Sequence, residues 1–104
     1  MAGVGKLMKQ AAKIQRQMEQ KQAELAEKTI EVSSGGGAVT ISMTCDSSKV
    51  TAIKIDPDSV DPDDVEMLQD LVVSAINSAI EKTKEISNEE MGKLTSGMSL
   101  PGLM

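Results

Sequence analysis

Four basic side chains near the beginning of the sequence are the residues best suited to bind a ligand. Lys6, Lys9, Lys13 and Arg16 follow one another at intervals of three, four and three residues. In a helix, which advances about 100° per residue, this spacing places all four within an arc of about 80°. Ammonium and guanidinium groups gathered on one face bind phosphate oxygens, so the pattern predicts a surface for a polyanion.

The element that must carry these side chains is a helix from Val4 to about Lys28. The segment is rich in Lys, Gln, Glu, Ala, Met and Leu, and it contains no proline and no glycine after Gly5. Its length of about 37 Å exceeds what a small core can cover, so part of it should project or pack against a second chain. An apolar stripe lies about 200° away from the basic face and is expected to be its buried side. This stripe consists of Val4, Leu7, Ala11, Ile14, Met18 and Leu25.

The net charge of the whole chain argues against binding of a polyanion, but the charge is unevenly distributed along the sequence. The 104 residues carry 11 basic and 16 acidic side chains, a net charge of -5. Through Lys28 there are six basic and three acidic residues, a net of +3, so the remainder carries -8. A basic helix face is also common as a merely solvated surface, and the pattern alone leaves both interpretations open. Binding to a membrane surface is not expected, because the apolar stripe is small and rich in Ala and Met.

The middle of the chain changes its apolar period from 3.6 to 2. In TIEVSS, AVTISMTC and VTAIKID, apolar residues alternate with polar ones, which is typical of half-buried strands. The glycines of SSGGG accept positive φ and predict a tight hairpin, and DSSK predicts a second turn. These segments predict an antiparallel meander of three strands, whose open edges favour pairing with another chain.

A second long helix is expected to follow the turn IDPDSVDPDD. Asp61 is the predicted N-cap with Pro62 at the first helical position, and Asp63 and Asp64 then fall in the first turn. A broad apolar face predicts that this helix lies on the sheet. The face consists of Val65, Leu68, Val72, Ala75, Ile76, Ala79 and Ile86.

The end of the chain offers secondary candidates and a tail. Lys82 and Lys84 are secondary candidates for contact with a polyanion, although the helix dipole explains them equally well. Ser87 or Asn88 is expected to restart a short third helix over EEMGKL. Residues from about 96 to 104 are expected to be a loosely held tail.

Composition excludes most other chemistry. The chain has no histidine, no aromatic residue and one cysteine, Cys45. A zinc site would therefore need several chains, and no nucleophile and base pair can be drawn unless lysine serves as the base. The glycines precede a strand rather than a helix, unlike a Walker loop, and the Asp-rich turn lacks the glycine of a calcium loop. We therefore expect no enzyme, no cofactor, no metal and no small-molecule substrate. No signal peptide or spanning segment is visible, and Cys45, expected to be buried, suggests a reducing compartment, so we expect a cytoplasmic protein.

Four stretches together resemble the YbaB/EbfC family of nucleoid-associated DNA-binding proteins. They are GKLMKQAAKIQRQMEQKQAEL, GGGAVTI, VEMLQDLVVSAINSAIEKTKE and the closing GMSLPGLM, and they cover nearly the whole chain in the family's order. One departure is Ser78, where the family commonly has an acidic residue.

The resemblance implies a single α+β domain over residues 1–104. It also implies a homodimer with joined sheets and projecting helices that binds double-stranded DNA in the bacterial nucleoid. Lys6, Lys9, Lys13 and Arg16 match the basic positions of the family's first helix in kind. The rival hypothesis is a protein-interaction scaffold, or a regulatory partner of recombination or replication proteins.

Overall fold

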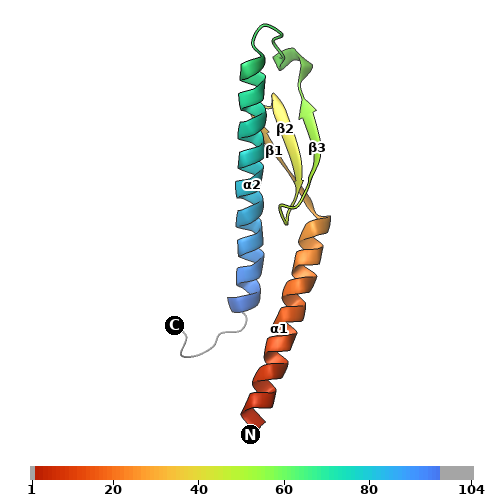
Figure 1. Cartoon of the computed structure of the whole chain (residues 1–104), viewed down its shortest axis with the longest axis vertical. Helices are drawn as coiled ribbons and strands as arrows, with labels where there is room; N and C mark the ends of the chain where they lie inside the picture. The colour runs from red at the N-terminus through yellow and green to blue at the C-terminus, as the bar shows by residue number, and fades with distance from the viewer. Residues whose placement is uncertain (1, 97–104) are drawn as a thin grey trace.

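The computed structural model describes residues 2–96, and the side chains of residues 3–94. Along this part of the chain, a long helix leads into a three-stranded sheet that is covered by a second long helix (Figure 1). The molecule is elongated, with principal extents of 73 × 26 × 16 Å. The elements are α1 (Ala2–Glu27), β1 (Thr29–Ser34), β2 (Val39–Thr44), β3 (Val50–Ile55), a 3-10 helix η1 (Pro57–Ser59) and α2 (Val65–Ser96).

The sheet is the predicted antiparallel meander, with the strand order β1-β2-β3. The β1–β2 turn places Gly35, Gly36 and Gly37 at φ values of +62°, +68° and +99°, where only glycine is free of strain. The second turn passes through Ser47, also at positive φ. The residue types of both turns thus fix the hairpins where the sequence predicted them.

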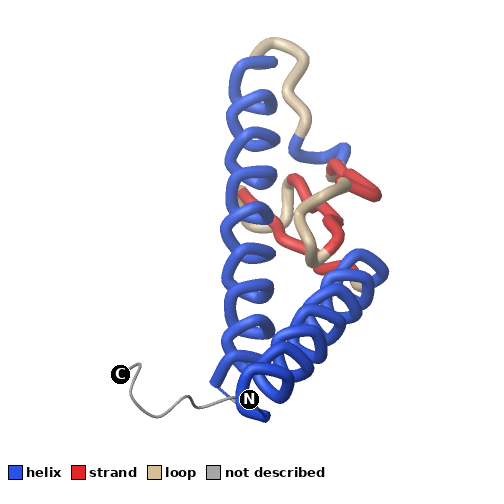
Figure 2. The backbone as a smooth tube through the Cα atoms, turned by 60° about the horizontal axis from the view of Figure 1, so that its bottom comes forward, coloured by secondary structure: helices blue, strands red, loops and turns tan. Residues whose placement is uncertain are grey.

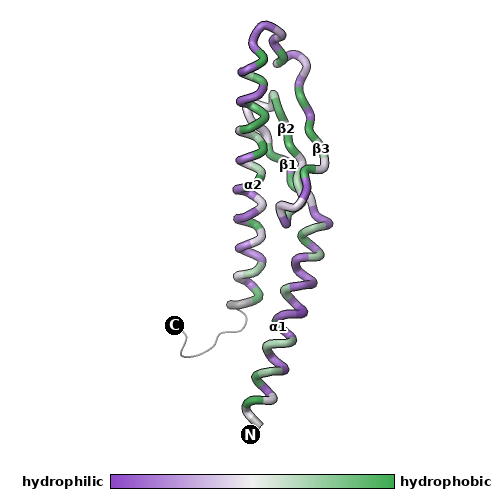
Figure 3. The backbone as a smooth tube through the Cα atoms, viewed as in Figure 1, coloured by the Kyte–Doolittle hydropathy of each residue, from purple (hydrophilic) through white to green (hydrophobic). Residues whose placement is uncertain are grey.

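The core lies between α2 and one face of β1 and β2. Val39 and Ile41 of β2 are fully buried, and they pack with Met43 against Ala75 and Ala79 of α2. The small alanines let the helix approach the sheet closely. Apolar colour accordingly gathers where α2 crosses the sheet (Figure 3). The prediction that α2 lies on the sheet is confirmed.

One buried hydroxyl ties the second turn to the middle of α2. Thr83 is completely buried, and its Oγ1 donates to the carbonyl oxygens of Ala79 at 3.0 Å or Ile80 at 2.9 Å. The same hydroxyl also lies in hydrogen-bond contact with the Ser47 hydroxyl of the β2–β3 turn. This polar contact fixes the far end of the hairpin on the helix.

The start of α2 differs from the prediction. Asp61 is not the N-cap, because its carboxylate accepts from the amide of Asp63 at 2.9 Å and closes a separate turn that contains Pro62. Asp64 takes the capping role instead, since its carboxylate accepts from the amide of Met67 at 3.2 Å. The helix therefore begins at Val65, three residues later than the predicted first position Pro62, and Val65 itself is exposed.

The end of α2 also differs, because no short third helix is formed within residues 2–96. The helix runs unbroken to Ser96. Ser87 lies one turn after buried Thr83 and is itself half-buried, so it continues the inward face rather than capping a new helix. The expected tail falls on residues 97–104, which lie outside the described residues.

Candidate nucleic-acid interface

Helix α1 is an arm held at one end. A single residue, Lys28, separates it from β1, and the Lys28 carbonyl accepts from the amide of Cys45 at the end of β2 at 2.8 Å. Leu25 is 2% exposed and packs the last turns of the helix onto the body. From there α1 runs antiparallel to α2, leans toward its C-terminal end and continues past it (Figures 1 and 2).

The covered face of the arm is narrow. Between residues 3 and 27, side chains that are not fully exposed occur only at Ile14, Gln17, Lys21 and Leu25, with the 3-4-4 spacing of one helix face. From Gly3 to Lys13 every side chain is exposed. The prediction that the chain's own core leaves part of the helix uncovered is therefore confirmed.

The apolar stripe as a whole is not the covered face. Only Ile14 and Leu25 belong to both sets, while Val4 and Leu7 are 56% and 60% exposed. The reason is tertiary, since α2 passes the side that carries Gln17 and Lys21 and ends before it reaches the first turns of α1.

The predicted basic residues stand together on the arm. The side chains of Lys6, Lys9, Lys13 and Arg16 are all exposed, and none of them forms a salt bridge within the part of the chain that the structure describes. Helical geometry places their common face about a quarter turn from the covered face. Four cations are thus presented to solvent over about 15 Å of helix, and none of them is paired in a salt bridge with another described residue.

A fifth cation of the arm is used differently. The Lys21 ammonium lies 3.2 Å from the carboxylate of Glu24 in its own helix and 3.5 Å from that of Glu90 in α2. Its hydrogen bond to Glu24, with a further contribution from Glu90, raises the pKa of Lys21. The nearby charge of Lys93, followed by that of Lys21, lowers the pKa of Glu90. Lys21 thus links the arm to α2 through Glu90. The sequence predicts only its pairing with Glu24, from their i, i+3 spacing.

Lys82 and Lys84 do not join the basic face of the arm. Both are exposed, but they flank buried Thr83 and therefore point to opposite sides of α2. They also precede Glu90 along α2, so they lie beside the sheet rather than beside the projecting half of α1. The fold brings these two candidates neither to each other nor to the first group.

The acidic residues gather at the opposite end of the molecule. Between residues 56 and 70 there are seven acidic side chains and no basic one. This segment forms η1, the following turn and the start of α2, which lie at the end of the long axis farthest from the beginning of α1 (Figure 1). The negative net charge therefore sits away from the basic arm, and approach of a polyanion is favoured from the arm side.

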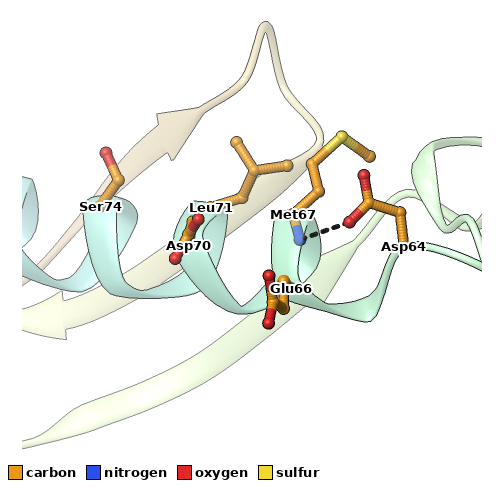
Figure 4. A pocket seen from close by; sticks show the side chains of 6 residues that line it. All are labelled: Asp64, Glu66, Met67, Asp70, Leu71 and Ser74. Atoms are coloured by element: carbon orange, nitrogen blue, oxygen red, sulfur yellow. Dashed lines mark hydrogen bonds between the residues drawn. The ribbon is translucent and has the colours of Figure 1, made fainter.

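A shallow hollow lies at the start of α2. Figure 4 shows its side chains, among which the Asp64 carboxylate turns back to the amide of Met67 as the helix cap. Within residues 2–96, no three His, Cys, Asp or Glu side chains are grouped as metal ligands. Among the described helices, none is long and apolar enough to cross a membrane.

The hollow at the start of α2 is formed by side chains of the first turns of the helix. The residues that line the hollow are Asp64, Glu66, Met67, Asp70, Leu71 and Ser74.

Comparison with known proteins identifies the family. A nucleoid-associated protein from Ruminiclostridium cellulolyticum is 54% identical over 98 residues, which is 93% of this chain and 84% of that protein. One from Alkaliphilus metalliredigens is 50% identical over 97 residues, with the same two coverages. The crystal structure of an uncharacterized protein from Helicobacter pylori shares the fold, with a TM-score of 0.74 and 19% identity over 86% of this chain and 92% of that one. A family model described as the YbaB/EbfC DNA-binding family matches residues 1–98, and the chain therefore belongs to this family.

Proposed function

We propose that this protein binds duplex DNA as a homodimer, mainly through phosphate contacts and with weak sequence preference. Through such binding it would act in the nucleoid, contributing to its organisation and influencing gene expression. The observation that carries the proposal is the face of Lys6, Lys9, Lys13 and Arg16, which is exposed and free of salt bridges within the described residues. Membership of a DNA-binding family makes duplex DNA the polyanion to expect.

The contacts are assigned to phosphates because of the residue types. Lysine and arginine on the outside of a helix reach the backbone without entering a groove, and such contacts carry no sequence information. The chain has no aromatic ring to stack on a base. An arm of 26 residues is about 39 Å long, comparable to one turn of B-DNA, so contacts can spread over about ten base pairs.

The homodimer is proposed because β3 is an edge strand whose residues are left exposed. All six of its residues are exposed, and Val50 and Ile53 are each 48% exposed. Ile53 pairs with buried Ile41 of β2, so it faces the same side of the sheet as the core, yet α2 packs over β1 and β2 instead. An exposed apolar edge strand is a template for pairing. Pairing of β3 with β3 of a second copy joins the two sheets and gives a dimer with two basic arms.

A salt titration of DNA binding tests the phosphate contacts. If about six phosphates are neutralised per dimer, log K should fall with log[salt] at a slope near -5. Replacing Lys6, Lys9, Lys13 and Arg16 together by Gln should weaken binding and flatten this slope, while circular dichroism shows an intact fold. Unchanged affinity and slope would remove this face as the site, and no duplex binding by the unaltered protein at physiological salt would favour the scaffold hypothesis.

Matched double variants separate a local contact from a change in net charge. Lys9→Gln with Lys13→Gln changes the charge by the same amount as Lys28→Gln with Lys49→Gln, whose side chains lie at the body end of the arm and in the β2–β3 turn. The proposal expects the first pair to make the salt dependence of DNA binding less steep. The second pair should leave that dependence nearly unchanged. Lys82→Gln with Lys84→Gln measures the secondary candidates in the same way.

A further inference from the structure

Four charged side chains lie together where α1 meets α2. The Lys21 ammonium is 3.2 Å from the carboxylate of Glu24 in its own helix and 3.5 Å from that of Glu90 in α2. The Lys93 ammonium is 3.4 Å from the Glu90 carboxylate within α2. Two cations and two anions thus alternate across the contact, and the Lys21–Glu90 salt bridge is the member that joins the two helices.

The Lys21–Glu90 pair is the more covered part of this group. The side chains of Lys21 and Glu90 are 25% and 29% exposed, whereas those of Glu24 and Lys93 are 55% and 64% exposed. Ion pairs that are partly shielded from solvent are screened less by salt than fully exposed pairs. The Lys21–Glu90 contact is therefore better placed to hold two helices together than an isolated pair on the open surface.

The contact with α2 sets the direction in which the exposed half of α1 runs. Lys21 belongs to the covered face of α1 and lies one turn from buried Leu25. From Gly3 to Lys13 every side chain is exposed, so within the described residues this half of α1 takes its direction from the turns that lie beside α2. The Lys21 side chain points about a quarter turn away from the basic face. Lys21 can therefore act on the basic face through the helix that carries both.

We propose that the Lys21–Glu90 salt bridge positions the basic face of α1 for DNA, and that neither residue touches the duplex. The inference rests on the proposed function. A helix already held in one direction loses less conformational freedom when it binds, which favours the complex. Glu90, although acidic, therefore promotes binding of a polyanion, and the ammonium of Lys21 stays with its carboxylate partners rather than with a phosphate.

Two test variants, Lys21→Gln and Glu90→Gln, separate positioning from net charge. The first removes a positive charge and the second a negative one, so net charge alone would weaken DNA binding in the first and strengthen it in the second. Positioning instead predicts that each variant raises the Kd for duplex DNA at least about threefold. The double variant should bind about as weakly as either single one, because both changes remove the same contact. A Kd for Glu90→Gln that is unchanged or lower would overturn the proposal.

The salt dependence of binding shows whether Lys21 touches a phosphate. Loss of one phosphate contact from each chain of the proposed dimer would reduce the slope of log K against log[salt] by about 1.8. The proposal expects Lys21→Gln to keep the slope of the natural protein while its Kd rises. A slope flatter by that amount would make Lys21 a direct contact and contradict its positioning role.

Glu89→Gln and Lys28→Gln are the matched controls. Each makes the same change of charge as one of the test variants, at an exposed side chain that takes part in no salt bridge within the described residues. Neither control should reproduce the loss of affinity. Absence of duplex binding by the natural protein would refute the proposed function itself, whereas undiminished binding by the test variants would overturn only the positioning role.

Distances between two spin labels measure the positioning without DNA. Met8 is 69% exposed on the arm and Val73 is 57% exposed on α2, so Met8→Cys with Val73→Cys in a Cys45→Ala background places one label on each helix. Labelled protein diluted with an excess of unlabelled protein reports distances within one chain. The two test variants should each broaden the distribution of these distances, whereas the Glu89→Gln control should not. Equal widths in all of these proteins would overturn the proposal.

Discussion

The β1–β2 turn offers a sharp test of how the hairpin is fixed on α2. Gly35 has φ +62°, and a Cβ atom added there would lie 2.7 Å from Cδ2 of Leu71 and 3.4 Å from its Cδ1. Gly36 has nearly the same φ, +68°, but its Cβ would meet open space. Ala at these two neighbouring positions therefore separates backbone strain from a steric contact.

The expected magnitudes follow from these two terms. A non-glycine residue at positive φ costs about 1 kcal/mol, so Gly36→Ala should lower the free energy of unfolding by about that amount. Gly35→Ala carries the same strain and also displaces the Leu71 side chain. The Ser34 hydroxyl donates to the Leu71 carbonyl oxygen at 2.7 Å and holds its backbone beside the turn, so the side chain must move alone. We expect a further cost of about 1 kcal/mol or more.

Urea unfolding at one fixed protein concentration measures both values, because dimer formation would otherwise alter the midpoints. Leu71→Ala completes a double-mutant cycle, since it removes the clash and should cost less in the Gly35→Ala background than in the natural sequence. Equal effects of Gly35→Ala and Gly36→Ala, with no coupling to Leu71, would refute the proposed contact.

Two further predictions concern the sheet edge and acid stability. Ile53→Lys should weaken the proposed dimer at least about 100-fold in sedimentation equilibrium, because a charge enters a two-fold interface twice, whereas Val73→Lys on the outside of α2 should leave the mass unchanged. A dimer that survives Ile53→Lys would reject pairing through β3. Hydrogen bonds from Thr44, and then from Ser48, lower the pKa of Asp46 below 3.8, so its contribution to stability is present above that pH and disappears as the pH falls through the folded-state pKa. Asp46→Asn should therefore be less stable than the natural protein at pH 7, and the difference should shrink in acid; a constant difference would contradict this origin.

The order of the elements could be predicted because each has a clear local signal. The apolar period changes from 3.6 to 2 after Lys28, and three consecutive glycines mark the first hairpin. The first and last residues of α2 were predicted less accurately. Asp61 and Asp64 are both good caps, and the choice between them depends on a turn that the Asp61 carboxylate closes.

The candidate site was predictable in part for a similar reason. Spacing within one helix placed Lys6, Lys9, Lys13 and Arg16 on one face without any tertiary information. The relation of that face to Lys82 and Lys84, and the pairing of Lys21 with Glu90, depend on where α2 crosses the sheet. The exposure of β3 was equally hidden, because its alternating pattern does not reveal which side a helix covers.

Because only Lys28 separates α1 from β1, a small rotation of α1 about this point produces a large displacement of its far end. From Lys28 to the first turn of α1 is about 37 Å, so a rotation of about 10° at the base moves the far end by about 6 Å. Successive base pairs are about 3.4 Å apart along one strand, and this displacement is close to two of them. In the proposed complex with DNA, small repacking around Leu25 would therefore change which phosphates the arm reaches, although that side chain lies far from the basic residues. If the arm binds a duplex as proposed, its reach is set by the hydrophobic contact of Leu25 at its base.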